Sequence, residues 1–197
     1  MRKLILASHN AGKLKEFQSL LSGLPFVVTS LADYPGIPEI KETGATFAEN
    51  AAIKAEAVAQ YTGELSLADD SGLEVDALHG SPGVYSARFA GEPASDEANN
   101  HKLLDLLSAV PEEKRTARFR CVIAIAAPGI PTQLAEGRCD GVITLTPCGT
   151  GGFGYDPLFY VPSQGKTFAE MTAEQKNKIS HRAHALAAAI SILHEFS

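Results

Sequence analysis

The feature that most constrains this chain is an apolar run that ends in two adjacent carboxylates, Asp69 and Asp70. The segment 73–77 that follows alternates apolar and acidic side chains. Alternation with period two predicts a strand with one buried face. Because Ser71-Gly72 is a turn-like pair, we expect the two carboxylates where a strand meets a turn, with a fixed backbone and side chains that reach solvent.

These two carboxylates allow two interpretations. Asp, Ser and Gly are ordinary turn residues, so 69–72 is compatible with a plain polar turn. Carboxylates at such a place also suit a hard cation such as Mg2+. Because neighbouring strand residues point to opposite faces, we do not expect Asp69 and Asp70 to bind the same ion. A metal site therefore needs another carboxylate from elsewhere in the chain.

Length and composition narrow the class of protein. The 197 residues are enough for one sizeable core, and the net charge of -6 is unlike that of a general nucleic-acid or membrane binder. The three cysteines are odd in number and show no Cys-x-x-Cys spacing, which is consistent with a reducing cytoplasm. No run approaches the roughly 18 apolar residues of a membrane span, and the first apolar run breaks too soon for a signal peptide.

The N-terminal segment predicts a candidate phosphate site. Residues 4–7 form a buried strand, Ser8–Lys13 a loop, and a helix follows from Leu14. Loop N–H groups, a helix N-terminus and the charge of Lys13 favour an anion. The Walker A spacing is absent, and a plain strand–helix connection is the alternative.

A second helix is predicted from its caps. Thr46 followed by Glu49 is a capping-box pattern, and the helix should run to about Tyr61 before Gly63. Glu49 then has a structural role, whereas Glu42 precedes the helix and can bind a ligand. Asn50 and Lys54 are four residues apart and share one helix face, for which a solvated polar face is the alternative.

The middle of the chain predicts a mixed sheet. Ser95 should start a helix, and residues 116–126 read as a long strand followed by strands over 133–137 and 141–146. We expect the helix to bury Leu103, Leu104, Leu106 and Leu107. Strands joined by tight turns pair antiparallel, whereas the N-terminal part alternates strand and helix, so a mixed sheet with flanking helices is the simplest architecture.

Two further segments suggest ligand binding. Four glycines fall within the six residues 149–154 and allow close approach of a ligand, beside the aromatic rings of Phe153 and Tyr155 and the carboxylate of Asp156. A long flexible turn is the alternative, although it would expose those rings. Five cationic or titratable side chains lie within residues 176–184, and two of them start a helix that should bury Leu186, Ile190 and Leu193. Cations at a helix N-terminus oppose its dipole, which indicates a bound anion.

These segments together resemble the inosine/xanthosine triphosphate pyrophosphatases. The resemblance covers essentially the whole chain, and its five motifs occur in the family's order. They are 8–13, Glu42-Thr43-Gly44 ahead of 47–51, Ala68 to Leu73, Gly149 to Pro157, and Ser180-His181-Arg182.

The resemblance implies a fold and an activity. It implies a single α/β domain over 1–197, with an elongated central mixed β-sheet, flanking helices and two lobes around an active-site cleft. It implies Mg-dependent hydrolysis of XTP, ITP and dITP to the monophosphate and pyrophosphate by attack of water at the α-phosphorus, which removes deaminated purines from the nucleotide pool. We further expect a cytoplasmic homodimer whose partner is a small nucleotide, with no nucleic acid and no membrane involved.

The resemblance also assigns roles to residues. Glu42 and Asp70 should hold Mg2+, and Asp70 corresponds to the catalytic residue that the family's proposed mechanism uses as proton acceptor. Because a carboxylate that binds a metal is a weak base, we expect Asp70 to position water rather than act as a strong general base. The substrate-binding residues implied are Ser8, His9, Asn10, Ala11, Gly12, Lys13, Lys54, Asp69, Ser71, Phe153, Gly154, Tyr155, Asp156, Lys176, His181 and Arg182. Phe153 could stack on the purine, and His181 or Arg182 could donate to its 6-keto oxygen. Alternatives are a related pyrophosphatase acting on pyrimidine or modified nucleotides, a nucleotide sensor without turnover and, more remotely, a nuclease.

Overall fold

The computed structural model describes residues 2–196, which form two compact units. Unit 1 contains residues 2–70, 121–137 and 182–196, and unit 2 contains residues 71–120 and 138–181. The chain therefore passes from one unit to the other directly after Asp70 and directly after His181. Between residues 2 and 196, no helix combines the length and apolarity needed to cross a bilayer.

In the described part of the chain, seven strands pair in the order β2-β1-β3-β4-β5-β6-β7. The strands are β1 (Arg2–Leu6), β2 (Phe26–Ser30), β3 (Leu65–Val75), β4 (Thr116–Ala127), β5 (Ile130–Ile143), β6 (Phe159–Val161) and β7 (Lys166–Thr167). β1 pairs parallel with β2 and β3, whereas β6 pairs antiparallel with β5 and β7. The predicted mixed sheet with flanking helices is confirmed.

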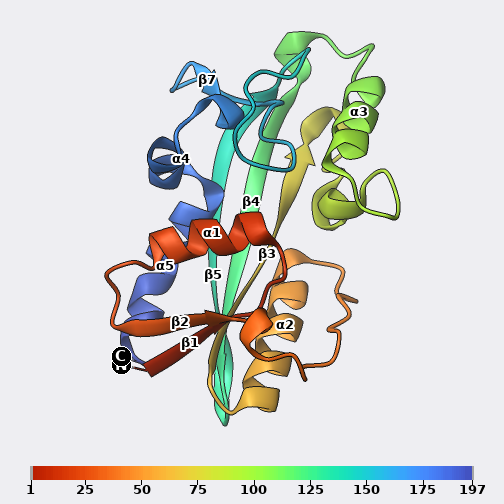
Figure 1. Cartoon of the computed structure of the whole chain (residues 1–197). Helices are drawn as coiled ribbons and strands as arrows, with labels where there is room; N and C mark the ends of the chain where they lie inside the picture. The colour runs from red at the N-terminus through yellow and green to blue at the C-terminus, as the bar shows by residue number, and fades with distance from the viewer. Residues whose placement is uncertain (1, 197) are drawn as a thin grey trace. The chain divides into compact units, whose positions relative to one another are not determined.

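Unit 1 is built from alternating strands and helices. Its helices are α1 (Ala11–Leu20), α2 (Phe47–Thr62) and α5 (His181–His194) (Figure 1). The first residue of α5, His181, is the last residue of unit 2. A short 3-10 turn, η1 (Leu31–Asp33), follows β2. The predicted caps of α2 are confirmed, because the Thr46 side chain accepts from the Glu49 N–H and Gly63 ends the helix at φ 74°. The Glu49 carboxylate accepts from the Ala45 N–H at 2.6 Å and not from the Thr46 N–H of a full capping box, so its role is structural but its partner differs from the predicted one.

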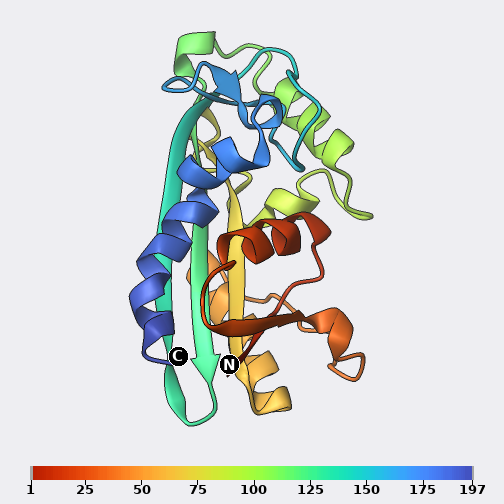
Figure 2. The ribbon, with the colours of Figure 1, turned by 60° about the vertical axis from the view of Figure 1, so that its left-hand side comes forward.

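The unit 1 helices cover both faces of its sheet. Asp69 of β3 meets side chains of α1 and α5, whereas Asp70 meets side chains of α2. Since consecutive strand residues point to opposite faces, α2 lies on the face opposite α1 and α5. On the α1 and α5 face, Phe17, Leu67 and Ile123 belong to one buried cluster with Ala185 and Ala189, and Figure 2 shows α5 running along β4 and β5.

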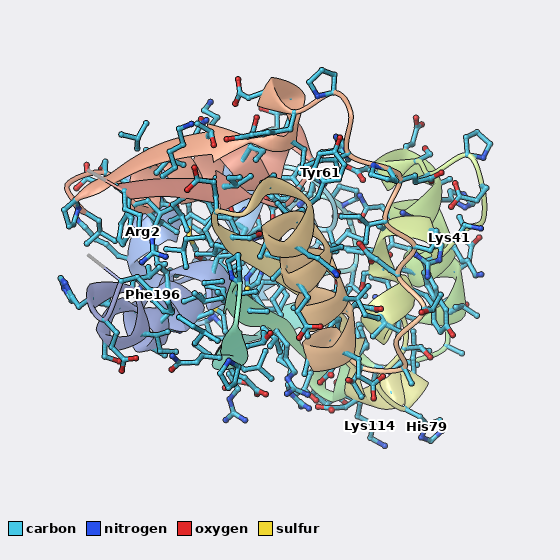
Figure 3. All side chains as sticks on the ribbon, turned by 90° about the horizontal axis from the view of Figure 1, so that it is seen from below. Arg2, Lys41, Tyr61, His79, Lys114 and Phe196 are labelled. Atoms are coloured by element: carbon cyan, nitrogen blue, oxygen red, sulfur yellow. The ribbon has the colours of Figure 1, made fainter. Side chains whose placement is uncertain are left out.

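The first strand and the last helix of unit 1 are tied together by one side chain. The Arg2 guanidinium lies 5.3 Å from the Phe196 ring centroid and donates to the Phe196 carbonyl at 3.4 Å. Figure 3 shows the two labelled residues beside each other. The pairing fixes the end of α5 against β1.

Unit 2 packs around an aromatic cluster. Its helices are α3 (Asp96–Leu106) and α4 (Ala173–Ile179), and its 3-10 turns are η2 (Asp76–Leu78), η3 (Gly83–Arg88), η4 (Glu112–Lys114) and η5 (Phe168–Glu170). The Phe119 ring centroid lies 4.7 Å from that of Phe159 and 5.8 Å from that of Phe168. Such offset and edge contacts between rings stabilise a core beyond the area they bury.

Three expectations about elements were wrong. Asp69 to Gly72 is not a turn, because β3 continues through it, and residues 133–137 and 141–143 belong to one strand, β5. Leu106 is 49% exposed and Ile190 is 38% exposed, while Ala185 and Ala189 are fully buried. The helical spacing was right in each case, but the width of the buried stripe depends on which neighbour packs against it.

Arg115 secures the end of α3. Its side chain is 3% exposed and donates to the carbonyls of Leu107, Val110 and Thr144 at 2.7, 3.0 and 3.3 Å. The guanidinium thus satisfies carbonyls that follow a helix C-terminus, where a cation is also favoured by the helix dipole.

Arg115→Met should lower the free energy of unfolding by about 3 kcal/mol, because buried carbonyl oxygens lose their donors. Arg118→Met is the matched control: Arg118 is more exposed and bonds to the exposed carboxylate of Asp76, so about 1 kcal/mol or less is expected. Urea unfolding of both variants checks this, and equal losses would contradict the assigned role of Arg115.

Candidate active site

The loop that follows β1 in unit 1 leads into a capped helix start, a place where proteins bind anions. The Ser8 hydroxyl accepts from the Asn10 N–H at 3.1 Å, and the Asn10 side chain caps α1 by accepting from the Lys13 N–H at 3.0 Å. Ala11, Gly12 and Lys13 lie in the first turn of α1, so the helix begins three residues before the expected Leu14. His9 and Ala11 are exposed. A helix N-terminus at this place suits a phosphate, because first-turn N–H groups and the helix dipole favour an anion.

Asp69 is the centre of a buried ion cluster. Its Oδ2 lies 3.0 Å from the Lys13 Nζ and 3.5 Å from the Arg182 Nε, and the Arg182 Nη1 donates to the Glu16 Oε2 at 2.8 Å. Burial alone would raise the pKa of Asp69, but the charges of Lys13 and Arg182 hold it well below its usual range. Asp69 therefore stays ionised and orients both cations.

The same cluster explains a cation near the start of α5. The sequence indicated that Arg182 needs an anion to offset the helix dipole. The structure supplies two from the protein itself, the carboxylates of Glu16 and Asp69. A bound ligand is therefore not required to stabilise this helix start.

Asp70 has different partners on the opposite face of β3. The Asn50 Nδ2 donates to the Asp70 Oδ2 at 3.2 Å, and the Lys54 Nζ lies 3.7 Å from the Asp70 Oδ1 and 2.8 Å from the Glu42 Oε1. Burial, with a smaller contribution from Glu42, raises the pKa of Asp70 despite the opposing charge of Lys54. Asn50 and Lys54 share one face of α2 as predicted, and because both are buried that face is not a solvated polar one. The predicted separation of Asp69 from Asp70 is also confirmed.

The carboxylate oxygens around Lys54 are suitable ligands for a magnesium ion. Glu42 and Asp70 already turn their oxygens toward one cation, the Lys54 ammonium. Residues 2–196 contain no cluster of three or more acidic, histidine or cysteine ligands. Mg2+ is commonly held by only one or two carboxylates, with phosphate oxygens and water completing its shell, so two carboxylates suffice. The raised pKa of Asp70 also indicates a carboxylate that would gain from a further positive charge.

In unit 2 the backbone of Phe153, in the glycine-rich loop, is held by hydrogen bonds to buried charged side chains. The Asp156 Oδ2 accepts from the Phe153 N–H at 3.0 Å and from the Lys176 Nζ at 2.6 Å. A Cβ on Gly152, at φ 72°, would lie 1.9 Å from the Asp156 Oδ2, so only glycine fits there. The Lys176 ammonium lies 5.0 Å from the centroid of the half-buried Phe153 ring, within cation–π range.

The remaining predicted residues of unit 2 differ in exposure. Tyr155 is buried in the core, and its hydroxyl donates to the Ser86 carbonyl at 2.7 Å, so its side chain supports the loop. His181 is 2% exposed, and its ring stacks on Phe119 with centroids 4.7 Å apart. Gly154 follows Phe153 at φ 61°, and Ser71 lies half-buried on β3 directly after Asp70.

The structure therefore gathers predicted residues into three groups, two in unit 1 and one in unit 2. Unit 1 joins Lys13 with Asp69 and Arg182, and Lys54 with Glu42 and Asp70. Unit 2 joins Phe153, Asp156 and Lys176. Glu16 was not predicted from the sequence, and its signal was its position one helical turn after Lys13 on α1.

Comparisons with known proteins give one consistent family. A family model described as the Ham1 family matches residues 4–192. A protein of Desulforamulus reducens named dITP/XTP pyrophosphatase is 61% identical over 97% of this chain and 95% of its own. Among solved structures, a HAM1 protein from Coxiella burnetii superposes with a TM-score of 0.89 at 44% identity over 99% of this chain and 100% of its own. The Staphylococcus aureus Ham1 protein gives 0.88 at 42% identity over 100% of both chains.

Neutralising the two adjacent carboxylates should move stability in opposite directions. Asp69→Asn should lower the unfolding midpoint at neutral pH, because it leaves Lys13 and Arg182 short of an anion. Asp70→Asn should raise the midpoint, because burial disfavours its ionised form. Thermal unfolding without divalent ions checks both, and the same sign for both variants would contradict the two assigned environments.

The pH dependence follows from the same pKa shifts. A depressed pKa means that the stability from Asp69 is present above its unfolded pKa of about 4 and is lost as the pH falls below it. A raised pKa means that the destabilisation from ionised Asp70 grows as the pH rises from about 4 through its folded pKa. The difference in unfolding midpoint between each variant and the unmodified protein should therefore become smaller at acidic pH.

Proposed function

The chain belongs to the Ham1 family, and on that premise we propose that it hydrolyses the non-standard purine nucleoside triphosphates XTP, ITP and dITP to the monophosphate and pyrophosphate. The observation that carries this proposal is the 61% identity, over nearly the full length of both chains, to a protein named dITP/XTP pyrophosphatase. The ion clusters of unit 1 and the aromatic loop of unit 2 supply chemistry suited to such a substrate.

The triphosphate would bind to the start of α1 and to two lysines. The N–H groups of the first turn of α1 and the side chain of Ser8 can contact phosphate oxygens. Lys13 is oriented by Asp69, and Lys54 by Glu42 and Asp70. Both lysines are mostly buried and already ordered by carboxylates, so binding phosphate costs them little additional side-chain entropy.

Glu42 and Asp70 are the residues that would hold Mg2+. When bound, the ion would neutralise phosphate oxygens and make the α-phosphorus easier to attack. Asp70 would also accept a hydrogen bond from the attacking water and orient it. Asn50 donates to one Asp70 oxygen, which fixes the carboxylate plane while the other oxygen faces Lys54.

The base would be bound by the unit 2 group. Phe153 offers a ring held by Asp156 and Lys176, and base–aromatic stacking contributes roughly 1–3 kcal/mol with little base preference. Selectivity therefore needs hydrogen bonds. A donor from His181 would match the 6-keto oxygen of hypoxanthine or xanthine and oppose the 6-amino group of adenine.

Several narrower expectations accompany the proposed activity. They are Mg dependence, attack at the α-phosphorus, a homodimer, cytoplasmic location, removal of deaminated purines from the nucleotide pool, and a single catalytic domain over residues 1–197. The named relatives support the substrate class most directly.

The first test is product analysis with dITP, XTP, dGTP, dATP and dTTP, with and without Mg2+. We expect monophosphate and pyrophosphate, released fastest from dITP and XTP and only with the metal. Asp70→Asn should lower kcat by about a hundredfold or more, because water positioning and metal binding are both lost. Asp76→Asn, which removes an exposed carboxylate of unit 2, is the control.

Each alternative function predicts a different product pattern. Release of orthophosphate or preference for dTTP would indicate another pyrophosphatase or phosphatase class. Binding without turnover would indicate a nucleotide sensor. Near-normal activity of Asp70→Asn would refute the role of Asp70 whatever the substrate.

His181→Phe tests the proposed base donor. The substitution preserves ring stacking on Phe119 and removes the imidazole nitrogens. We expect the dITP-to-dATP ratio of kcat/KM to fall about tenfold or more, because the hydrogen bond that distinguishes keto from amino is lost. Arg182→Ala is a poorer test, since it would leave the buried carboxylates of Glu16 and Asp69 unpaired. An unchanged ratio would exclude His181 as the base reader.

A further inference from the structure

The N–H and the carbonyl of Gly154 are both hydrogen-bonded by side chains of one helix, α3. The Gly154 N–H donates to the Asp96 Oδ2 at 2.7 Å, and the Gly154 carbonyl accepts from the Asn100 Nδ2 at 2.9 Å. All three residues belong to unit 2. None of the motifs that carry the family resemblance includes Asp96 or Asn100.

The spacing on α3 makes this arrangement specific. Asp96 and Asn100 are four residues apart, so their side chains lie on one face of the helix. A carboxylate can only accept and the Asn100 amide nitrogen can only donate, which matches the N–H and the carbonyl of Gly154 respectively. The Ser95 side chain caps the helix start by accepting from the Ala98 N–H, which fixes the turn that carries Asp96.

The pair adds a second anchor to the Phe153 backbone. On its N-terminal side, the Phe153 N–H donates to the Asp156 carboxylate, which is held by Lys176. On its C-terminal side, the next residue is fixed by α3. Gly152 and Gly154 both have positive φ, 72° and 61°, and glycine is the residue with the greatest backbone freedom. Without external hydrogen bonds this stretch would sample other conformations.

We propose that Asp96 and Asn100 are positioning residues that set how tightly the base of the nucleotide binds, acting through Phe153. The proposal rests on the proposed function, in which Phe153 stacks on the base. The hydrogen bonds of the pair to Gly154 lie within unit 2, on the loop that carries Phe153. The pair therefore controls the affinity for the base and leaves the hydrolytic step and the phosphate contacts unchanged.

Steady-state kinetics with dITP test the pair. Asp96→Ala and Asn100→Ala should each raise KM about three- to tenfold, the effect expected for loss of one hydrogen bond, with kcat changed less than about twofold. Inorganic tripolyphosphate, which has no base, should inhibit all variants with the same constant. A fall in kcat with unchanged KM, or weaker inhibition by tripolyphosphate, would overturn the proposal.

Two neighbouring substitutions are matched controls. Glu97→Ala also removes an acid from the first turn of α3, so it reproduces any loss of helix-dipole stabilisation. His101→Ala removes an exposed side chain that pairs with Asp105. Neither should change KM, and an equal rise in KM for Asp96→Ala and Glu97→Ala would assign the effect to the helix rather than to Gly154.

A double-mutant cycle separates positioning from general support. In a Phe153→Ala background, Asp96→Ala should raise KM no further, because the ring that it positions is absent. Independent, multiplicative effects would show that Asp96 does not act through Phe153 and would overturn the proposal.

Amide exchange provides a readout that does not need turnover. Asp96→Ala should accelerate hydrogen exchange at the Gly154 amide, whereas Glu97→Ala should not. If the unmodified protein fails to hydrolyse dITP, the proposed function fails, yet this measurement still reports on the pair. Unchanged exchange in Asp96→Ala would show that Asp96 does not hold the loop.

Discussion

The alternation of side chains along β3 places two adjacent carboxylates in opposite electrostatic environments. Asp69 points to the face of α1 and α5, where Lys13 and Arg182 keep it ionised. Asp70 points to the face of α2, where burial raises its pKa and Lys54 only partly compensates. One backbone geometry therefore yields a carboxylate that orders two cations and a second carboxylate whose ionised form a further positive charge would stabilise.

This division explains why unit 1 carries so many charges in its interior. A buried ion pair gains little stability by itself, because desolvation offsets most of the attraction. Glu16, Arg182, Asp69 and Lys13 nevertheless form a continuous chain of such pairs in addition to the apolar cluster of unit 1. The arrangement is understandable if its role is to hold Lys13 in place for phosphate. Unit 2 repeats the principle with Asp156 and Lys176, which hold the backbone and one face of Phe153.

Local patterns predicted the elements whose signals lie within a few residues. Thr46 and Gly63 marked the ends of α2, and Ser95 marked the start of α3. The same approach failed at 69–72, where turn-type residues lie inside a strand, because pairing within the sheet overrides weak turn preference. It also failed at Ile190, because the spacing of apolar residues does not say which neighbour covers them.

The sequence by itself determined the chemistry available to this protein: the carboxylates Glu42 and Asp70, the cations Lys13 and Lys54, and the aromatic glycine loop, all in the order of one family. It did so because capping, periodicity and motif order are properties of neighbouring residues. Only the tertiary structure decided the pairings, such as Arg182 with Glu16, which are 166 positions apart, and Gly154 with Asp96 and Asn100. Contacts between distant segments depend on how strands register and helices pack, and no short stretch of sequence encodes that arrangement.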